Sequence, residues 1–156
     1  MHEGSCLCRA VTFTVAGELP PPTACHCTRC RKHTGHYEAG TDVARSALTL
    51  TGGEHLTWYF SSDKVRRGFC SICGSSLFFD PPQRDWIGIM MGAFDTPTRT
   101  RLALHIFVAD KGDYYDIADG VPRLQVLIAL CYASLCLANQ AKHIRGTSRK
   151  LSDELQ

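Results

Sequence analysis

The sequence predicts a mainly β fold, an all-β barrel or sandwich made of short strands. Two observations carry this prediction: eight short runs have strand-like composition or alternation, and clusters of turn-forming residues separate them. A third observation, three compact groups of cysteines, indicates that metal ions tie the chain together. A length of 156 residues suits one domain, or one domain with an appendage.

The first predicted strand covers residues 10–16, where Val11, Phe13 and Val15 share one face. Three consecutive prolines follow this strand. Because proline cannot donate a hydrogen bond to a neighbouring strand, this segment is predicted to be a loop. Residues 28–34 are predicted to form a short helix that Gly35 ends. In such a helix Cys27 and Cys30 lie one turn apart on the same side.

Seven further strands are predicted along the chain. They cover residues 37–43, 47–50, 55–60, 65–69, 76–79, 86–91 and 102–108. Turn signals stand at residues 52–53, 61–63, 80–82 and 95–97. The large aromatic side chains in these runs are interpreted as core residues: Trp58, Tyr59, Phe78, Phe79 and Trp86.

Seven of the nine cysteines fall into the three groups. The pairs are Cys6-x-Cys8 and Cys70-x-x-Cys73, and the group of three is Cys25, Cys27 and Cys30. A closed tetrahedral zinc site takes four ligands, and a catalytic one takes three and keeps one position open. Seven cysteines are what one site of each kind would use.

Disulfides are the other use for so many cysteines. The N-terminal residues show neither a basic region nor a long apolar stretch with a cleavage site, so no secretory signal is predicted. We therefore expect a reducing, cytoplasmic location, in which clustered cysteines more often bind metal.

The charge argues against nucleic acid as a partner. The formal net charge is +2 with every cysteine counted as neutral. Seven thiolates and two divalent ions change this charge by −3, to about −1. The metal-loaded protein would then not be basic overall, which weakens any prediction of nucleic-acid binding that rests on charge.

Three segments together resemble the glutathione-dependent formaldehyde-activating enzyme family, which includes centromere protein V. They are Gly4-Ser5-Cys6-x-Cys8, Cys25-His26-Cys27-x-x-Cys30-Arg31-Lys32 and Arg67-Gly68-Phe69-Cys70-x-x-Cys73-Gly74. The resemblance covers residues 4–122 and departs from the family pattern at Leu7 and Arg9. It implies an Mss4-like zinc-containing β-barrel of short antiparallel strands in a domain of residues 1–122.

The resemblance also implies the ligand sets and the activity. Cys6, Cys8, Cys70 and Cys73 match the family's structural zinc ligands. Cys25, Cys27 and Cys30 match its catalytic zinc ligands. The implied reaction, of the carbon–sulfur lyase type, joins glutathione as co-substrate to formaldehyde or a related small electrophile and gives S-hydroxymethylglutathione.

Few other residues stand out for this chemistry. His26 and His33 are the titratable groups nearest in sequence that could pass a proton to the new hydroxyl. Three basic residues are candidates for binding the glutathione carboxylates: Arg29, Arg31 and Lys32.

Structural interpretations stand beside these roles. His26 can simply pack between two ligands, and His105 is more typical of a core residue or a partner of a metal ligand than of a base. The basic residues can form a solvated face. The whole chain can be a non-catalytic, zinc-stapled binding module, because fold does not imply function.

Residues 123–156 lie outside the resemblance and are predicted to form an appended helical tail. Residues 124–138 are apolar almost all round and would span ~22 Å as a helix, short of the ~30 Å of a bilayer core. No membrane partner is therefore expected. A helix apolar on all sides needs burial, either on the barrel or in a homo-oligomer interface.

Overall fold

The structure is a computed structural model, and it describes residues 1–126. The strands are β1 (His2–Ser5), β2 (Thr12–Val15), β3 (Thr23–Cys25), β4 (Glu38–Ala44), β5 (Leu48–Thr51), β6 (Leu56–Ser62), β7 (Val65–Cys70), β8 (Ser76–Asp80), β9 (Trp86–Met90) and β10 (Leu104–Ile106). One α-helix, α1 (Thr28–Thr34), follows β3. Four 3-10 turns cover Arg45–Ala47, Gly53–His55, Met91–Ala93 and Val108–Asp110.

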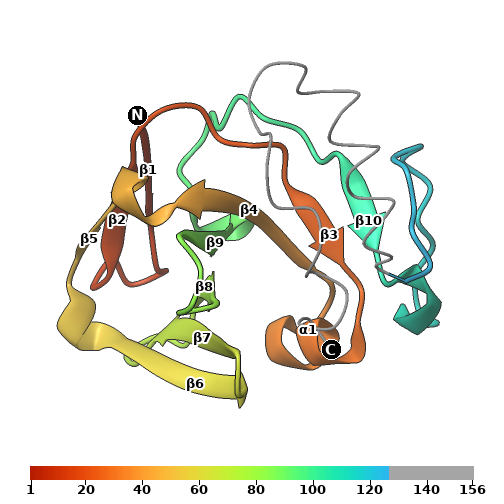
Figure 1. The fold of residues 1–156 in the computed structure, drawn as a ribbon, viewed down its shortest axis with the longest axis horizontal. Coiled ribbons are helices and arrows are strands. Elements are labelled where there is room, and N and C mark those ends of the chain that lie inside the picture. The colour runs from red at the N-terminus through yellow and green to blue at the C-terminus, as the bar shows by residue number, and fades with distance from the viewer. Residues whose placement is uncertain (127–156) are drawn as a thin grey trace.

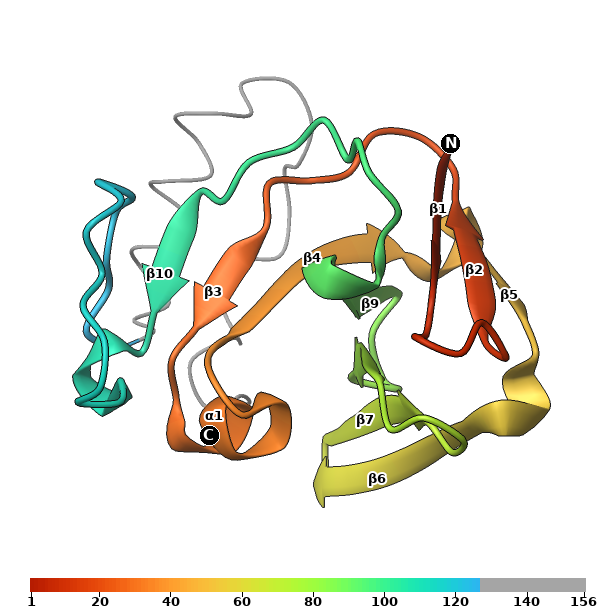
Figure 2. The ribbon, with the colours of Figure 1, turned by 180° about the vertical axis from the view of Figure 1, so that it is seen from behind.

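These strands form two sheets. The smaller sheet has the order β1-β2-β5, and the larger has the order β10-β3-β4-β9-β8-β7-β6. Figures 1 and 2 show the larger sheet curling from β10 round to β6, with the smaller sheet on one side. The helix α1 lies at the lower end of β3 and β4 in both views.

The hydrophobic core joins the two sheets. The Phe13 ring of β2 makes edge contacts with Phe78 of β8 and with Phe94. Val43 of β4 and Ile89 of β9 are buried in the same cluster. Because side chains alternate along a strand, the other face of β3, β4 and β9 is free to form a site.

The described residues do not form the expected closed barrel of antiparallel strands. The seven-stranded sheet ends at β10 on one side and at β6 on the other, and these two strands do not pair. One pairing is parallel, with His105 of β10 opposite Ala24 of β3. The long connection between β3 and β10 makes this direction possible, since only antiparallel neighbours can be joined by a tight turn.

The sequence located most elements to within a few residues. The helix 28–34 is confirmed, and Gly35 ends it with a φ of +81°. The strands β1 and β3 were not predicted, because three or four residues show no clear alternation. Tyr59 was expected in the core, but it is 61% exposed on the edge strand β6.

The predicted helix 124–138 lies almost wholly outside the described residues. Its first three residues, 124–126, are described and are not helical, because Leu124 instead donates its backbone N–H to the carbonyl of His105 in β10. No helix within residues 1–126 is long and apolar enough to cross a membrane.

Candidate active site

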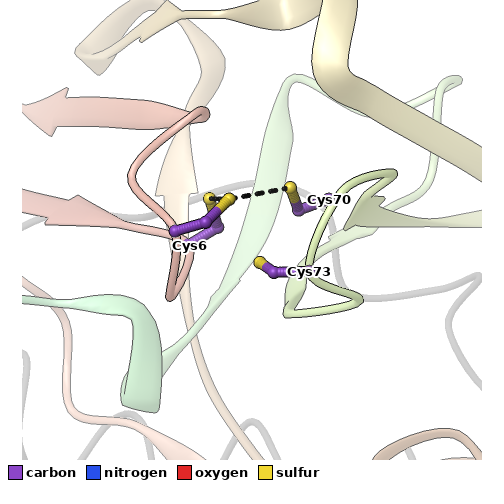
Figure 3. Close-up of side chains that lie close together, drawn as sticks. Cys6, Cys70 and Cys73 are labelled. Carbon is purple, nitrogen blue, oxygen red and sulfur yellow. Dashed lines mark hydrogen bonds between the residues drawn. The ribbon is translucent and has the colours of Figure 1, made fainter.

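The first cysteine cluster links the two sheets. Cys6 and Cys8 lie in the turn between β1 and β2, whereas Cys70 ends β7 and Cys73 lies in the turn before β8. The four sulfurs lie within 4.8 Å of one another. The sulfurs of Cys8 and Cys70 are 3.8 Å apart. Figure 3 shows Cys70 and Cys73 on the side that faces Cys6. Tetrahedral zinc with Zn–S bonds near 2.3 Å places sulfurs about 3.8 Å apart, so this donor set fits a closed metal site.

The surroundings of this four-thiol cluster are neutral and local. The Val11 amide donates a hydrogen bond to the Cys6 sulfur over 3.3 Å. The side chain and backbone of Ser75 lower the pKa of the Cys73 thiol to about 5 by hydrogen bonding. Cys8 is exposed at the surface, so the cluster opens to solvent rather than to a cavity. Such a site is suited to tying segments together.

The second cluster comes from a single segment. Cys25 is the last residue of β3, Cys27 is the N-cap of α1, and Cys30 lies in the first turn of that helix. The Cys27 sulfur accepts a hydrogen bond from the Cys30 amide, so the capping interaction itself brings these two thiols together. All three sulfurs lie within 4.8 Å of one another. Cys27 and Cys30 thus lie on the same side of the first turn, close enough to reach one ion.

The pKa values of the three thiols are shifted in opposite directions. Hydrogen bonds from Cys25 and Cys30 lower the pKa of Cys27 to about 2. The hydrogen bond between Cys25 and Cys27 raises the pKa of Cys25 to about 12, and the pKa of Cys30 is raised chiefly by its bond with Cys25. One thiolate therefore forms readily, and a metal cation that replaced the two remaining protons would ionise all three. The donor set fits a soft metal ion.

A buried ion pair adjoins the three-thiol cluster. Arg67 of β7 is 4% exposed, donates a hydrogen bond to the carboxylate of Glu38, and places its other terminal nitrogen 3.6 Å from the Cys30 sulfur. Burial raises the pKa of Glu38, and Arg67 opposes that shift. Arg67 therefore puts a fixed positive charge beside a group of sulfurs that become negative on ionisation.

A cavity of about 290 Å³ opens on the three-thiol cluster. Its floor is one face of the larger sheet, because the residues that line it alternate along the strands: Thr23 and Cys25 of β3, Glu38, Gly40 and Asp42 of β4, and Trp86, Gly88 and Met90 of β9. Arg67, Phe79, Ile106 and Phe107 are among the residues that complete the lining. The volume lies near the lower limit for small-molecule sites.

The floor of the cavity carries a second acidic residue, Asp42. Its carboxylate lies over Gly88, where an added Cβ would stand 3.1 Å from the Asp42 Oδ1 atom. The side chain is exposed within the open cavity, and partial loss of hydration there, followed by repulsion from Glu38, raises the pKa of Asp42 to about 6. Within residues 1–126 no cation or hydrogen-bond donor pairs with this carboxylate.

The His26 side chain points away from this cavity. Its ring is fully buried, and it is hydrogen-bonded to the Tyr115 hydroxyl and, over 2.8 Å, to His105. His105 is in turn hydrogen-bonded to Asp119 over 2.8 Å. Burial, followed by repulsion from His105, lowers the pKa of His26 to about 4. This chain of contacts fixes the backbone between Cys25 and Cys27, which suits the structural interpretation.

The basic residues of α1 are not brought together. Arg29 lines the cavity, whereas Arg31 and Lys32 do not. Lys32 is exposed, and the buried Nε atom of Arg31 has no partner within residues 1–126. His33 is hydrogen-bonded to the hydroxyl of Ser76 over 3.0 Å and is likewise not part of the lining. Of these predicted contacts, only Arg29 can touch a ligand in the cavity.

Sequence reasoning missed the Glu38–Arg67 pair and Asp42. The alternation of Glu38, Gly40 and Asp42 along one strand was visible, but a strand with polar residues on one face usually exposes them to water. Only the curled sheet shows that this face is the floor of a cavity.

Comparisons with known proteins identify relatives of this chain. The sequence model of the family "Glutathione-dependent formaldehyde-activating enzyme" matches residues 1–110. A Halomonas elongata protein that carries this family's name is 33% identical over 125 residues, covering 74% of this chain and 80% of that protein. An uncharacterized lyase of Schizosaccharomyces pombe is 28% identical over 127 residues, covering 76% and 86% of the two chains.

A solved structure shares the fold. The crystal structure of a Rhodobacter sphaeroides protein matches with a TM-score of 0.51 and 22% identity, covering 78% of this chain and 98% of that one. Together with the extent of the family match, the two cysteine clusters lead to one conclusion: the chain belongs to the glutathione-dependent formaldehyde-activating enzyme family.

Proposed function

We propose that the protein is a zinc-dependent lyase of the carbon–sulfur type that joins glutathione to formaldehyde or a related small electrophile. The observation that carries this proposal is the three-thiol cluster, which opens into a cavity of about 290 Å³ beside a buried arginine. Three sulfurs leave a tetrahedral ion one position for a further ligand. The family to which the chain belongs and its lyase-named relative support the same activity.

The three-thiol cluster would hold the catalytic zinc ion. Zinc bound by Cys25, Cys27 and Cys30 would supply a Lewis acid that keeps a fourth thiol ionised at neutral pH. The Arg67 guanidinium donates a hydrogen bond to the Cys30 sulfur through one terminal nitrogen. Its other terminal nitrogen donates to the Glu38 carboxylate, which fixes the position of the guanidinium. These two residues position the sulfurs and limit the charge that gathers on them.

The cavity wall would orient glutathione and keep water away. Phe79, Trp86 and Met90 give it an apolar lining, in which a thiolate is a better nucleophile than in water. Arg29, on the same wall, is placed to bind a glutathione carboxylate.

The reaction balances without an oxidant or a reductant. The thiol of glutathione loses its proton, and the thiolate sulfur forms a bond to the carbonyl carbon. The π electrons of the carbonyl move to the oxygen, which takes up a proton from solvent to give the hydroxyl. His26 does not face this oxygen, because its ring is hydrogen-bonded to Tyr115 and His105 and is not part of the cavity lining.

Formaldehyde consumption tests the proposal directly. Metal-loaded protein should accelerate the formation of S-hydroxymethylglutathione from ¹³C-formaldehyde, followed by NMR, only when glutathione is present. In cobalt-loaded protein, glutathione should change the thiolate absorbance, because a fourth sulfur enters the coordination sphere. A rate equal to the uncatalysed one, together with an unchanged cobalt spectrum, would instead indicate a non-catalytic binding module.

Further expectations belong to the same proposal. Zinc would occupy both clusters, giving two ions per chain, and reduced thiols would place the enzyme in the cytoplasm. Residues 1–122 would form the zinc domain and 123–156 the tail, with a homo-oligomer formed through 124–138. Analytical ultracentrifugation of the full chain and of a chain ending at residue 126 tests the last point.

A further inference from the structure

The cavity is elongated, with different chemistry at its two ends. Cys25 pairs with Glu38 in the register of β3 and β4, so the thiols mark one end of the row formed by Glu38, Gly40 and Asp42. Asp42 lies four positions along the extended strand from Glu38, a span of about 13 Å. A ligand that reached both ends would place a sulfur near the thiol cluster and another group near Asp42.

The far end is prepared for a cation. The Asp42 carboxylate faces the cavity, and within residues 1–126 no positive side chain pairs with it. The other charged groups of the lining are already committed or lie elsewhere: Arg67 is paired with Glu38, and Arg29 comes from the helix beside the thiols. The Asp42 side chain is exposed within the open cavity, and partial loss of hydration there, followed by repulsion from Glu38, raises its pKa, so a positive ligand would favour the ionised carboxylate.

Between the two ends of the cavity, the floor is formed by Gly40, which has no side chain to occupy the space above β4. A Cβ at Gly40 would meet only the backbone of Ile89, at 3.4 Å, so a side chain there would fit the fold and project into the cavity. Gly40 is therefore not needed for packing or for a special backbone angle. Its absence of a side chain leaves a path along β4 from the cysteines to Asp42.

We propose that Asp42 is the specificity-determining residue of this cavity and binds the primary ammonium group of the γ-glutamyl arm of glutathione. This inference rests on the proposed function. Eight covalent bonds separate the sulfur of glutathione from that nitrogen, a reach of about 10 Å when extended. A sulfur held in front of the thiol cluster therefore brings the ammonium to the Asp42 end of the floor. Thiols without a distant ammonium group lack this contact.

Deaminated glutathione, in which hydrogen replaces the ammonium group, provides the test. Binding of glutathione and of this analogue to the metal-loaded protein is measured by calorimetry. The wild-type protein should bind glutathione about tenfold more tightly than the analogue. Asp42→Asn should weaken glutathione binding about tenfold and leave the analogue unchanged. Asp113→Asn, which changes an exposed carboxylate outside the cavity, should alter neither affinity.

Gly40→Ala is a second, independent variant. It should remain folded and weaken both ligands by a similar factor, because a methyl group blocks the shared path. Gly92→Ala, at a position where a Cβ meets nothing within 4 Å, is its matched control.

The outcomes separate this inference from the proposed function. Equal affinity of the wild-type protein for the two ligands, or equal weakening of both by Asp42→Asn, would overturn the role of Asp42 and leave the enzyme proposal intact. Failure of the wild-type protein to bind either thiol would overturn both.

Discussion

The two cysteine clusters use the same ligand type in opposite ways. The four-thiol cluster takes sulfurs from two segments about 60 residues apart, one from each sheet, and faces neutral groups such as Ser75. The three-thiol cluster takes all its sulfurs from residues 25–30 and faces a cavity with a buried ion pair. The difference lies in what surrounds the sulfurs, because the donor atoms are identical.

This difference indicates which ion holds the chain together and which is exposed to a ligand. A metal ion that joins distant segments removes conformational freedom from the unfolded chain, as any crosslink does. An ion held by one helical turn and the strand before it adds little of this kind. Stability and reactivity are therefore expected to separate between the two clusters, and substitutions can test that separation.

The largest effect is expected at Cys73. A structural zinc ion contributes about 10–16 kcal/mol of apparent binding energy, comparable to the net stability of about 5–15 kcal/mol of a typical domain. Cys73→Ser should therefore be insoluble, or unfolded by circular dichroism. Ile72→Ser, at an exposed neighbouring position, should fold normally. A soluble, folded Cys73→Ser protein that holds one metal ion would assign the stabilising role to the other cluster.

The second-largest loss of stability is expected on substitution of Arg67. Removing one partner of a buried ion pair leaves the other charge without compensation, at a cost of about 3–5 kcal/mol. Arg67→Met should lower the free energy of unfolding by this amount in urea titrations, and Arg67→Met combined with Glu38→Gln should recover part of it. Arg101→Met, at an exposed position, serves as the control. An unchanged unfolding midpoint for Arg67→Met would show that Glu38 is not dependent on the arginine.

The sequence predicted the clusters better than their surroundings. Short cysteine spacings and the helix ended by Gly35 are local features, so they can be read directly from a few residues. Local pattern also located eight strands, but not β1 or β3, which are too short to show a period.

The cavity could not be predicted in the same way. It depends on how seven strands curl and on which face of β4 lies inward, and both follow from long-range pairing. The contact between Arg67 and Cys30 joins residues 37 positions apart. The closed barrel was likewise inferred from a resemblance, and the described residues form two open sheets instead.

Cys27→Ser should have a smaller effect on the fold and a large one on activity. Serine is a favourable N-cap, so α1 keeps its first hydrogen bond. The variant should hold about one metal ion per chain by mass spectrometry, retain its circular dichroism spectrum and lose glutathione-dependent turnover. Thr28→Ser, at the adjacent exposed position, should keep both ions and activity. If Cys27→Ser unfolds as readily as Cys73→Ser, the contrast between the clusters is wrong.

The smallest effect should come from Asp42, and it should depend on pH. The pKa of this carboxyl is about 6 in the folded protein, above its ordinary value of 3.8. A group with a raised pKa contributes stability that is fully present below about pH 4 and is lost as the pH rises through about 6. Asp42→Asn removes this loss, so the variant should gain stability over the wild type between pH 4 and pH 7. Because the side chain is open to the cavity, solvent screening should keep the gain below about 1 kcal/mol.

Glutathione should then reverse the sign of this difference. An ammonium group beside Asp42 favours the ionised carboxylate, so the ligand should stabilise the wild type more than Asp42→Asn at pH 7. Thermal unfolding of both proteins at pH 4.5 and pH 7, with and without glutathione, measures the effect, and Asp113→Asn is the control. A difference between Asp42→Asn and the wild type that stays constant with pH would show that Asp42 is an ordinary solvated carboxylate. The four thiols of the other cluster do not line the cavity that holds Asp42, so the pH-dependent contrast belongs to the end of the molecule where a substrate would bind.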